Sequence, residues 1–537
     1  MNLSDPTQTN VSPWNRFAVA FNELDLWVLI FILLFLNTFS LKLGSNEEEY
    51  FVFAKAFANP NWLPGAHSVK DLPGGRIIFD SVIGYLLRFA SFEQVAEYGR
   101  TLVALLFALP LAKLFRKLKF SNLECLFVLQ IICCLVHQSF FAYEWIFGGF
   151  ETKAISYVFV FYSLYHLLEN QTLRGVIFAG FAIYFHILVG GWYALVMFFY
   201  LLVLRTPLKK LCLYSLAISA FTAPLVVYLV KYHFLNNPEI INGVRVSKIY
   251  VYLCNPQHLD MWGSIGRWGS TTQIGVALSL LSLALCFYLY RRNPDLNIKR
   301  LSLLNICLFV QQAVSLFIAA FDANGNFLKF YPYRTSSLSF FLMLLLLVML
   351  YKEIESGKSH RANQLAKVKL FPASYPFPVV MLMFVVIVLG LSFKVWSNGR
   401  DSYQVIYPSS REIDRLDLYR WVREHTPKDS VFLEPAPGKR GNLDFIRKTE
   451  RDLFSVDKFV PTTNPLIYEW YVRTLENIEV KKNISYVHEL RDRYRIDYVV
   501  NKTPLNDPGI KLEFRSGSEY LYSLHSPVSL PASPPFE

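Results

Sequence analysis

The chain has 537 residues, of which 53% are hydrophobic and only 18% are charged, whereas about a quarter of the residues in soluble domains are charged. Because the apolar residues are gathered in long uninterrupted runs, this composition excludes an ordinary soluble enzyme and indicates a membrane protein. The formal net charge of +12 would by itself suggest a nucleic-acid ligand. Residues 401–537, however, hold 20 Lys and Arg against 21 Asp and Glu, so the whole excess lies in the first 400 residues, and we expect no nucleic-acid partner.

Eleven apolar segments are predicted to cross the bilayer as helices, since about 20 helical residues span roughly 30 Å of hydrocarbon. The last segment ends near residue 395, so residues 1–395 form the predicted membrane domain. A long loop, 44–99, follows the first segment. The segments lie near 26–43, 100–115, 121–138, 153–168, 174–190, 191–204, 211–230, 273–290, 301–321, 335–351 and 377–395.

The distribution of charge between the loops predicts the orientation of the chain. With a cytoplasmic N-terminus, the loops on that side contain 18 Lys and Arg and 7 Asp and Glu, whereas the short opposite loops 139–153 and 322–334 together contain three of each. This asymmetry satisfies the positive-inside rule. No convincing cleavage site follows the first apolar run, so we expect a signal anchor in the plasma (inner) membrane. Eleven spans then place the C-terminus outside the cytoplasm.

Residues 400–537 are predicted to form a small extracytoplasmic α/β domain, because helical and strand patterns alternate there. Helices are predicted over 411–425, 464–478 and 487–494, and strands over 430–433, 497–500, 511–514 and 520–524. The predicted fold class is therefore an α-helical polytopic membrane protein of about eleven transmembrane helices with a C-terminal α/β domain.

An acidic cluster, Asn46-Glu47-Glu48-Glu49-Tyr50, opens the loop 44–99 directly after the first span. Adjacent carboxylates repel one another, so such a cluster holds a proton or recruits a cation, and Glu47, Glu48 and Glu49 are candidates for a general base acting on a hydroxyl. The alternative is a solvated helix start with Ser45 as N-cap. Further along the loop, the apolar stretch 77–89 is expected to lie along the membrane surface or to pack against the membrane domain.

Two other groups of polar residues lie at the external ends of predicted spans. Glu151 and Lys153 stand at the start of the span 153–168, and His186 lies in apolar sequence near a tight external turn. Each of them has a candidate binding role and a structural alternative: Glu151 would cap a helix, Lys153 would extend its ammonium group to the interface, and His186 would be a buried hydrogen-bonding residue.

Two further groups lie in later external loops. His258 and Asp260, in the loop 231–271, are candidates for acid/base work, although two residues do not define a site. Arg334 ends the sequence Phe330-Tyr331-Pro332-Tyr333-Arg334, where its guanidinium could bind two phosphate oxygens or, alternatively, anchor the interface. Since the acidic cluster and all of these groups fall on the external side of the predicted topology, we predict a functional site at the external membrane interface.

Together these features resemble the GT-C superfamily of glycosyltransferases, which use polyprenyl-phosphate-linked sugars. The shared features are an acidic cluster after the first span, a long first external loop, about eleven spans and an external C-terminal domain. A bacterial family of polytopic membrane proteins with this architecture is also similar. The segments that carry this similarity are 47–63, 147–153, 186–192, 255–259, 331–334, 421–433, 456–461 and 469–471.

The resemblance implies a membrane glycosyltransferase that acts outside the cytoplasm. A first-loop acid, here Glu47, Glu48 or Glu49, would deprotonate the acceptor hydroxyl, which would displace the lipid phosphate with inversion. Many GT-C members have Asp at this place, so the resemblance decides neither which Glu acts nor whether a divalent cation, Mg²⁺ or Mn²⁺, takes part. The implied partners are a polyprenyl-phosphate sugar donor, a glycan, lipid or protein acceptor, and the bilayer.

Charge and position assign the remaining candidate residues. A leaving phosphate needs fixed cations, and Arg76, Arg100 and Arg334 are the candidates to hold it. The residues expected to line the substrate cavity are Glu151, Lys153, His186, His258 and Asp260.

Two other functions compete with a glycosyltransferase. A glycolipid transporter would place ionisable groups near the middle of the bilayer on broken helices in matched halves, whereas these spans are poor in charge and the sequence has no visible repeat. A non-catalytic receptor or assembly protein would use a GT-C-like membrane domain as a scaffold and bind its partner through the C-terminal domain.

Overall fold

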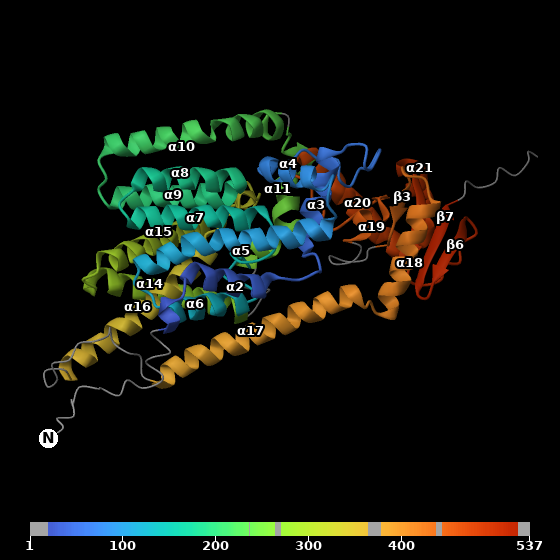
Figure 1. Ribbon diagram of the computed structural model, residues 1–537. Helices are drawn as coiled ribbons and strands as arrows, with labels where there is room; N and C mark the ends of the chain where they lie inside the picture. Colours follow the sequence, from blue (N-terminus) through green and yellow to red (C-terminus); the bar gives the residue numbers. More distant parts are fainter. Residues whose placement is uncertain (1–19, 236, 264–269, 363–376, 436–442, 525–537) are drawn as a thin grey trace, which may run out of the picture.

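The structure is a computed structural model, and it describes residues 20–235, 237–263, 270–362, 377–435 and 443–524. A body of roughly parallel helices occupies one side of the molecule and an α/β domain the other (Figure 1). Helices occur at all eleven places where spans are predicted. They are α2 (Leu26–Thr38), α5 (Phe92–Lys117), α6 (Asn122–Cys134), α7 (Thr152–Leu168), α8 (Thr172–Phe185), α9 (Ile187–Val203), α10 (Leu208–Leu229), α14 (Ser270–Arg292), α15 (Leu296–Ala319), α16 (Ser336–Ala362) and α17 (Phe377–Ile406).

Within the described residues, six of these helices are long and apolar enough to cross a membrane. They correspond to α5, α10, α14, α15, α16 and α17, and they confirm a multi-pass membrane fold. The other five, α2, α6, α7, α8 and α9, have only 13 to 17 residues. At 1.5 Å per residue such helices fall short of a full bilayer crossing, so the predicted count of eleven spans is not confirmed.

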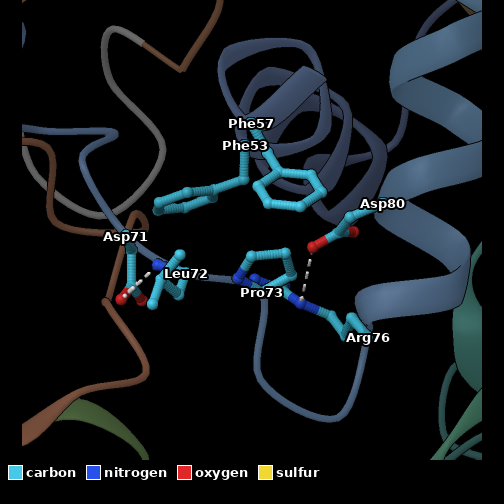
Figure 2. Close-up of a pocket in the computed structure, with 7 residues that line it drawn as sticks. All are labelled: Phe53, Phe57, Asp71, Leu72, Pro73, Arg76 and Asp80. Carbon is cyan, nitrogen blue, oxygen red and sulfur yellow. Dashed lines mark hydrogen bonds and ion pairs between the residues drawn. The ribbon is translucent and has the colours of Figure 1, made fainter. Parts of the chain in front are cut away.

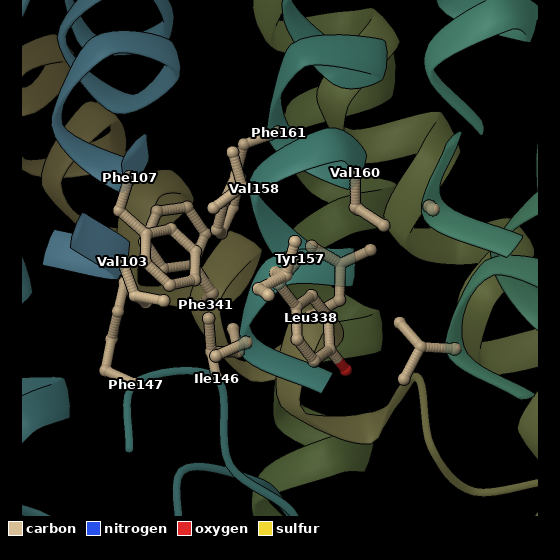
Figure 3. Close-up of a cluster of buried hydrophobic side chains, with 14 of the residues drawn as sticks. Val103, Phe107, Ile146, Phe147, Tyr157, Val158, Val160, Phe161, Leu338 and Phe341 are labelled. Carbon is tan, nitrogen blue, oxygen red and sulfur yellow. The ribbon is translucent and has the colours of Figure 1, made fainter. Parts of the chain in front are cut away.

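Aromatic side chains hold the external loop before α7 against the helical body (Figure 3). The ring of Phe107 on α5 lies 5.0 Å from that of Phe147 in the loop and 6.1 Å from that of Phe161 on α7, and Phe161 lies 4.9 Å from Phe341 on α16. All four side chains are buried. Because cores are closely packed, this aromatic cluster fixes the position of the polar residues in the same loop, such as Glu144 and Glu151.

The loop 44–99, called the first external loop after its predicted side, forms two short helices that pack on each other, α3 (Ser45–Ala58) and α4 (Ile77–Leu86). Helix α4 buries Phe79 and Ile83 but leaves Val82 and Tyr85 more than half exposed. One face of this helix therefore packs against the protein, as one of the two expectations has it. The other face presents apolar side chains outward, and its placement on the membrane surface stays a prediction.

The loop between α10 and α14 contains several short elements. They are the π-helix η1 (Val230–Phe234), the hairpin β1 (Ile240–Ile241) and β2 (Val244–Arg245), α11 (Val246–Lys248), the π-helix η2 (Ile249–Cys254) and α12 (Pro256–Leu259). A 3₁₀ turn, η3 (Leu328–Phe330), precedes α16.

The C-terminal residues form an α/β domain, as predicted, around a mixed sheet of five strands, one more than the four predicted. Its elements are α18 (Ser410–His425), β3 (Val431–Leu433), α19 (Phe445–Thr449), β4 (Asp452–Leu453), α20 (Asn464–Lys482), η5 (Ile484–Tyr486), α21 (Val487–Tyr494), β5 (Ile496–Asn501), β6 (Ile510–Ser516) and β7 (Glu519–Leu524). The strand order is β4-β3-β5-β7-β6, with β4, β3 and β5 parallel and β7 antiparallel to both β5 and β6.

Side-chain alternation along the strands explains why helices cover both faces of this sheet. Phe432 and Val500 belong to the core on the side of α18 and α19, whereas Leu433 and Val499 belong to the core on the side of α20 and α21. The first of these cores continues into the membrane domain, since the ring of Phe459 lies 5.7 Å from that of Phe53 on α3. The C-terminal domain is therefore packed directly onto the first external loop.

Candidate active site

The three acids of the first external loop lie in the first turns of α3, and all three are buried, with exposed fractions of 1%, 7% and 8% for Glu47, Glu48 and Glu49. The solvated helix start considered above is therefore wrong. The N-cap is Gly44, and its N–H donates to Glu47 at 2.7 Å. Successive helix residues point about 100° apart, so the three carboxylates meet three different sets of neighbours.

Glu47 is bound on both oxygens. Arg100 donates from Nε at 2.8 Å and also from Nη2, and the backbone N–H of Phe150 donates at 2.7 Å. The Arg100 guanidinium also donates to the carbonyl oxygens of Ser40 and Lys42. This pair ties α3 to α5 and to the loop before α7, and it leaves Arg100 engaged with protein groups.

Glu48 is bound by the C-terminal domain. Arg447 on α19 donates from Nε and Nη2 to its two oxygens at 2.7 and 2.8 Å, and it reaches Glu93 through Nη1. Burial raises the pKa of Glu48, while the hydrogen bonds and charge of Arg447 lower it. A two-pronged arginine pair of this kind holds a carboxylate in a fixed geometry.

Glu49 has a different environment, since its charged neighbours lie farther away than the arginines that bind Glu47 and Glu48. Lys458 Nζ lies 3.4 Å from Oε2, and Arg76 Nη1 lies 3.7 Å from Oε1. Burial raises the pKa of Glu49, and the positive charges of Lys458 and Arg76 oppose this shift. All three acids are buried. Glu49 has a raised pKa and is the one of the three that no arginine holds with two hydrogen bonds.

A second charged cluster surrounds Glu144 in the loop before α7. Its Oε2 accepts from Lys153 Nζ at 3.1 Å and from Arg334 Nη1 at 2.9 Å, and His258 Nδ1 lies 3.7 Å from Oε1. Burial opposes ionisation, but Arg334 and Lys153 lower the pKa of Glu144 to about 2. The cluster therefore contains two cations and one buried anion, which leaves it positive.

The cations of this cluster lie against aromatic rings. Lys153 Nζ lies 3.0 Å from the ring centre of Trp145, and the Arg334 guanidinium lies 4.1 Å from that of Tyr331. The Nε atom of Arg334 is buried and has no hydrogen-bond partner among the described residues. Tyr157 donates to the Arg334 carbonyl at 2.8 Å, which fixes the backbone beside this guanidinium. Arg334 therefore has a donor available for a bound anion.

Hydrogen bonds connect the two clusters. Glu151 accepts from Trp145 Nε1 at 2.7 Å and from Asn46 Nδ2 at 2.9 Å, and Asn46 Oδ1 accepts from Lys458 Nζ at 2.9 Å. Glu151 is the N-cap residue of α7 by position, but its side chain makes no capping hydrogen bond. The chain of contacts runs from Lys458 of the C-terminal domain to the cations of the membrane domain.

Tyr50 gives a second link between the clusters. Burial raises the pKa of its hydroxyl, Glu49 and Glu151 raise it further, and Arg76 and Arg334 lower it. Arg76 lies with its guanidinium 4.4 Å from the Tyr50 ring centre. The charges of both clusters therefore influence the Tyr50 hydroxyl.

Arg76 also lines a narrow crevice beside the site (Figure 2). Its Nε lies 3.8 Å from Asp80 Oδ2, and Phe53 and Phe57 cover the other side of the crevice. Burial raises the pKa of Asp80 to about 6, and its Oδ1 has no hydrogen-bond partner among the described residues. Sequence reasoning did not single out Asp80.

Three predicted cavity residues have structural contacts of their own. His186 is the N-cap of α9 and accepts from the N–H of Val189 at 3.3 Å. His258 donates from Nδ1 to the carbonyl of Ala142 at 2.7 Å, and burial lowers its pKa to about 4, so its ring is neutral at pH 7. Asp260 accepts from the N–H of Gly263 at 2.9 Å. Only His258 lies within the Glu144 cluster.

Sequence reasoning missed the residues that the C-terminal domain contributes, Lys458 and Arg447. It also missed Glu144 and Trp145 as site residues, although they lie only a few residues before Glu151 and Lys153. Lys458 lies in the segment 456–461, which carries part of the family similarity, and this was the one available signal. In the part of the chain that the structure describes, no three His, Cys, Asp or Glu side chains form a group that could hold a metal ion. The divalent cation considered above stays a prediction.

Comparisons with known proteins give likenesses of fold. No family model matches the sequence, and no curated protein matches it. The chain matches the crystal structure of ArnT from Cupriavidus metallidurans bound to undecaprenyl phosphate, with a TM-score of 0.47 and 12% identity over 97% of this chain and 100% of that one. The apo structure of that protein matches with the same score and identity over 95% and 97% of the two chains. The cryo-EM structure of the arabinofuranosyltransferase AftD from mycobacteria matches with a TM-score of 0.43 and 12% identity, over 95% of this chain but 40% of that one.

Proposed function

We propose that this protein is a membrane glycosyltransferase that transfers a sugar from a polyprenyl-phosphate-linked donor to a hydroxyl group of an acceptor, with Glu49 as the general base. The observation that carries the proposal is the contrast within the acidic cluster. Glu47 and Glu48 are each held by an arginine on both oxygens, whereas Glu49 is buried with only longer ion pairs. The donor class follows from the GT-C resemblance of the sequence.

The chemical step assigns a role to each part of the site. The acceptor oxygen attacks the anomeric carbon of the donor while Glu49 takes its proton, and the bond between that carbon and the phosphate oxygen breaks. Because the attack is in line, the configuration at the anomeric carbon inverts. The electron pair leaves with the polyprenyl phosphate, and the proton passes from Glu49 to water when the products depart.

The environment of Glu49 supports this role. A carboxyl group with a raised pKa binds a proton more readily than an exposed one, and a base works best when its pKa approaches the working pH. Burial also excludes bulk water from the carboxylate, which strengthens its interaction with a hydroxyl donor.

Arg334 is the proposed anchor of the departing phosphate. Fixed cations in a buried site stabilise charge that develops on a leaving group. Arg334 retains a buried unpartnered Nε, and Lys153 adds a second positive charge on the same carboxylate, Glu144. Arg76, beside Glu49, is the proposed contact of the sugar-proximal part of the donor. Arg100 is assigned a structural role, since Glu47 and two carbonyl groups take up its donors.

The orientation proposed for the chain has a cytoplasmic N-terminus and an extracytoplasmic site. The charged site and the C-terminal domain lie together at one end of the helical body (Figure 1). The basic loops 113–119, 168–174, 205–210 and 291–300 lie at the opposite end.

The proposal is tested by turnover of lipid-linked donors. The purified protein in lipid nanodiscs is incubated with a panel of undecaprenyl-phosphate-linked sugars and an extract of envelope acceptors, and released undecaprenyl phosphate is measured. We expect at least one donor to be consumed, and Arg334→Gln to lower its turnover by about 100-fold or more, which is the effect of losing one donor to a developing anion. Arg174→Gln, at a side chain bonded to Gln171, is the matched control and should retain activity.

Two results would count against the proposal. One is the absence of turnover for every donor by protein that remains monodisperse and binds undecaprenyl phosphate. The other is full activity of Arg334→Gln.

A further inference from the structure

Lys458 reaches the site from a rigid segment of the C-terminal domain between β4 and α20. Its neighbours Val456 and Phe459 are buried, with exposed fractions of 2% and 1%. Trp470 on α20 donates to the Val456 carbonyl at 3.0 Å, and the N–H of Thr462 donates to Asp71 of the first external loop. Both ends of the segment are thus fixed, which holds the Lys458 side chain toward α3.

The ammonium group of Lys458 joins two residues of α3. It donates to Asn46 Oδ1 at 2.9 Å and lies 3.4 Å from Glu49 Oε2. We propose that Lys458 is a positioning residue of the active site, whose charge keeps Glu49 ionised and aligned, so that the C-terminal domain completes the catalytic machinery. This inference rests on the proposed function of Glu49 and extends it to a second domain.

Several charged or titratable groups lie around Glu49, and they do not all shift its pKa in the same direction. Burial raises the pKa of Glu49, Lys458 and then Arg76 lower it, and Glu151 raises it. Lys458 is thus the larger of the two cationic influences that oppose burial. Among the described residues, the groups that interact electrostatically with Glu49 are Tyr50 from α3, Arg76 from the turn before α4, Asp80 from α4, Glu151 from the start of α7, Tyr250 from η2 and Lys458 from the C-terminal domain.

A simple role in docking the C-terminal domain does not account for Lys458. Docking is provided by Arg447, which binds both oxygens of Glu48 and reaches Glu93, and by Asp452, which accepts from the N–H groups of His67 and Ser68. The ion pair of Lys458 with Glu49 is longer than that of Arg447 with Glu48, and Lys458 keeps about a third of its side chain exposed. Two basic residues of one domain therefore meet two consecutive acids, and Arg447 serves as the matched control for Lys458.

The experiment measures the protonation of Glu49 and the pH dependence of turnover in the full-length protein. Infrared difference spectra between the protein and Glu49→Gln report the Glu49 carboxyl group without any substrate. The variants are Lys458→Met, Lys458→Gln, Lys458→Arg and Arg447→Met, each checked for monodispersity by size-exclusion chromatography. The same set is then assayed with the lipid-linked sugar that is consumed in the turnover assay.

We expect the protonation midpoint of Glu49 to move to higher pH in Lys458→Met and Lys458→Gln, because a cation that favours the ionised form has been removed. The acidic limb of the kcat/KM profile should move in the same direction. Since one pKa unit corresponds to a factor of ten in ionised fraction, we expect a loss of about tenfold or more on that limb and recovery of activity at higher pH. Lys458→Arg should resemble the unchanged protein, and Arg447→Met should alter activity without moving the limb.

An unchanged midpoint in both uncharged variants would overturn the inference, and so would a loss of activity that is equal at all pH values, which would make Lys458 a substrate contact. These results leave the role of Glu49 intact as long as Glu49→Gln is inactive. Full activity of Glu49→Gln would instead contradict the proposed function itself.

Discussion

At the scale of single residues, the three adjacent glutamates illustrate how helix geometry separates chemically identical groups. Glu47 turns toward Arg100, Glu48 toward Arg447, and Glu49 toward Arg76 and Lys458 at longer range. An ion pair with two strong hydrogen bonds fixes a carboxylate and occupies its lone pairs, whereas a buried carboxylate without such a pair keeps its oxygens available for a hydroxyl donor. The assignment of Glu49 as the base follows from this difference.

The sequence could indicate the acidic cluster but could not distinguish its members. The partners that distinguish them lie far along the chain, from Arg76 to Lys458, and no local pattern specifies those contacts. The same holds for Glu144, whose partner Arg334 is 190 residues away. That the polar groups gather on one side could be predicted, because this needs only the positions of the apolar runs. In the structure, most of these candidate residues lie in one region.

At the scale of elements, the break between α8 and α9 shows a close approach that depends on glycine. His186 ends α8 and begins α9, and the turn brings Gly190 against the backbone of α8. A Cβ atom at Gly190 would overlap backbone atoms of Ala182 and Ile183, whereas a Cβ at the adjacent Gly191 would meet no atom within 4 Å.

We therefore predict opposite outcomes for two neighbouring alanine substitutions. Gly190→Ala should destabilise the protein by about 1–3 kcal/mol, the usual cost of an overpacked site, because backbone atoms cannot move aside easily. Gly191→Ala should be neutral or slightly stabilising, since alanine favours helix over glycine by up to about 1 kcal/mol. The measurement is thermal unfolding in detergent followed by size-exclusion chromatography. Equal behaviour of the two variants would contradict the packing described for this turn.

The elements themselves were largely predictable, and the exceptions have a physical explanation. Long apolar runs gave helices at all eleven predicted places, and the alternating patterns of the C-terminal domain gave α21, β5, β6 and β7 close to their observed bounds. Helix α19 and strand β4 were not predicted, because five and two residues are too few for a periodic pattern. Helix α19 carries Arg447, so a short element missed from sequence positions a residue of the site's surroundings.

At the scale of the whole molecule, the first external loop and the C-terminal domain form one continuous unit at one end of the helical body. Arg447 binds Glu48, Asp452 accepts from the backbone of His67, and Phe459 packs on Phe53. Helix α17 runs along the helical body and leads to α18 (Figure 1). The C-terminal domain therefore lies at one end of the body, and the loop after α14 lies at the other end.

This arrangement predicts the sidedness of reporter fusions. A reporter that follows Glu537 should lie outside the cytoplasm, and one that replaces the chain after Arg292, at the end of α14, should lie in the cytoplasm. Paired phosphatase and fluorescent-protein fusions measure both positions. Placement of both reporters on the same side of the membrane would contradict the arrangement of the helices, and an exchange of sides would contradict the proposed orientation.

The central claim, that Glu49 is the general base, is tested most directly by single-turnover rates of three isosteric variants with the same lipid-linked donor. Glu49→Gln should lower the rate of sugar transfer by about 100-fold or more, the usual contribution of a general base, while the donor still binds. Glu47→Gln and Glu48→Gln should lower stability through Arg100 and Arg447, and their correctly folded fraction should retain transfer. Full transfer by Glu49→Gln, or loss of transfer confined to folded Glu47→Gln or Glu48→Gln, would contradict the assignment.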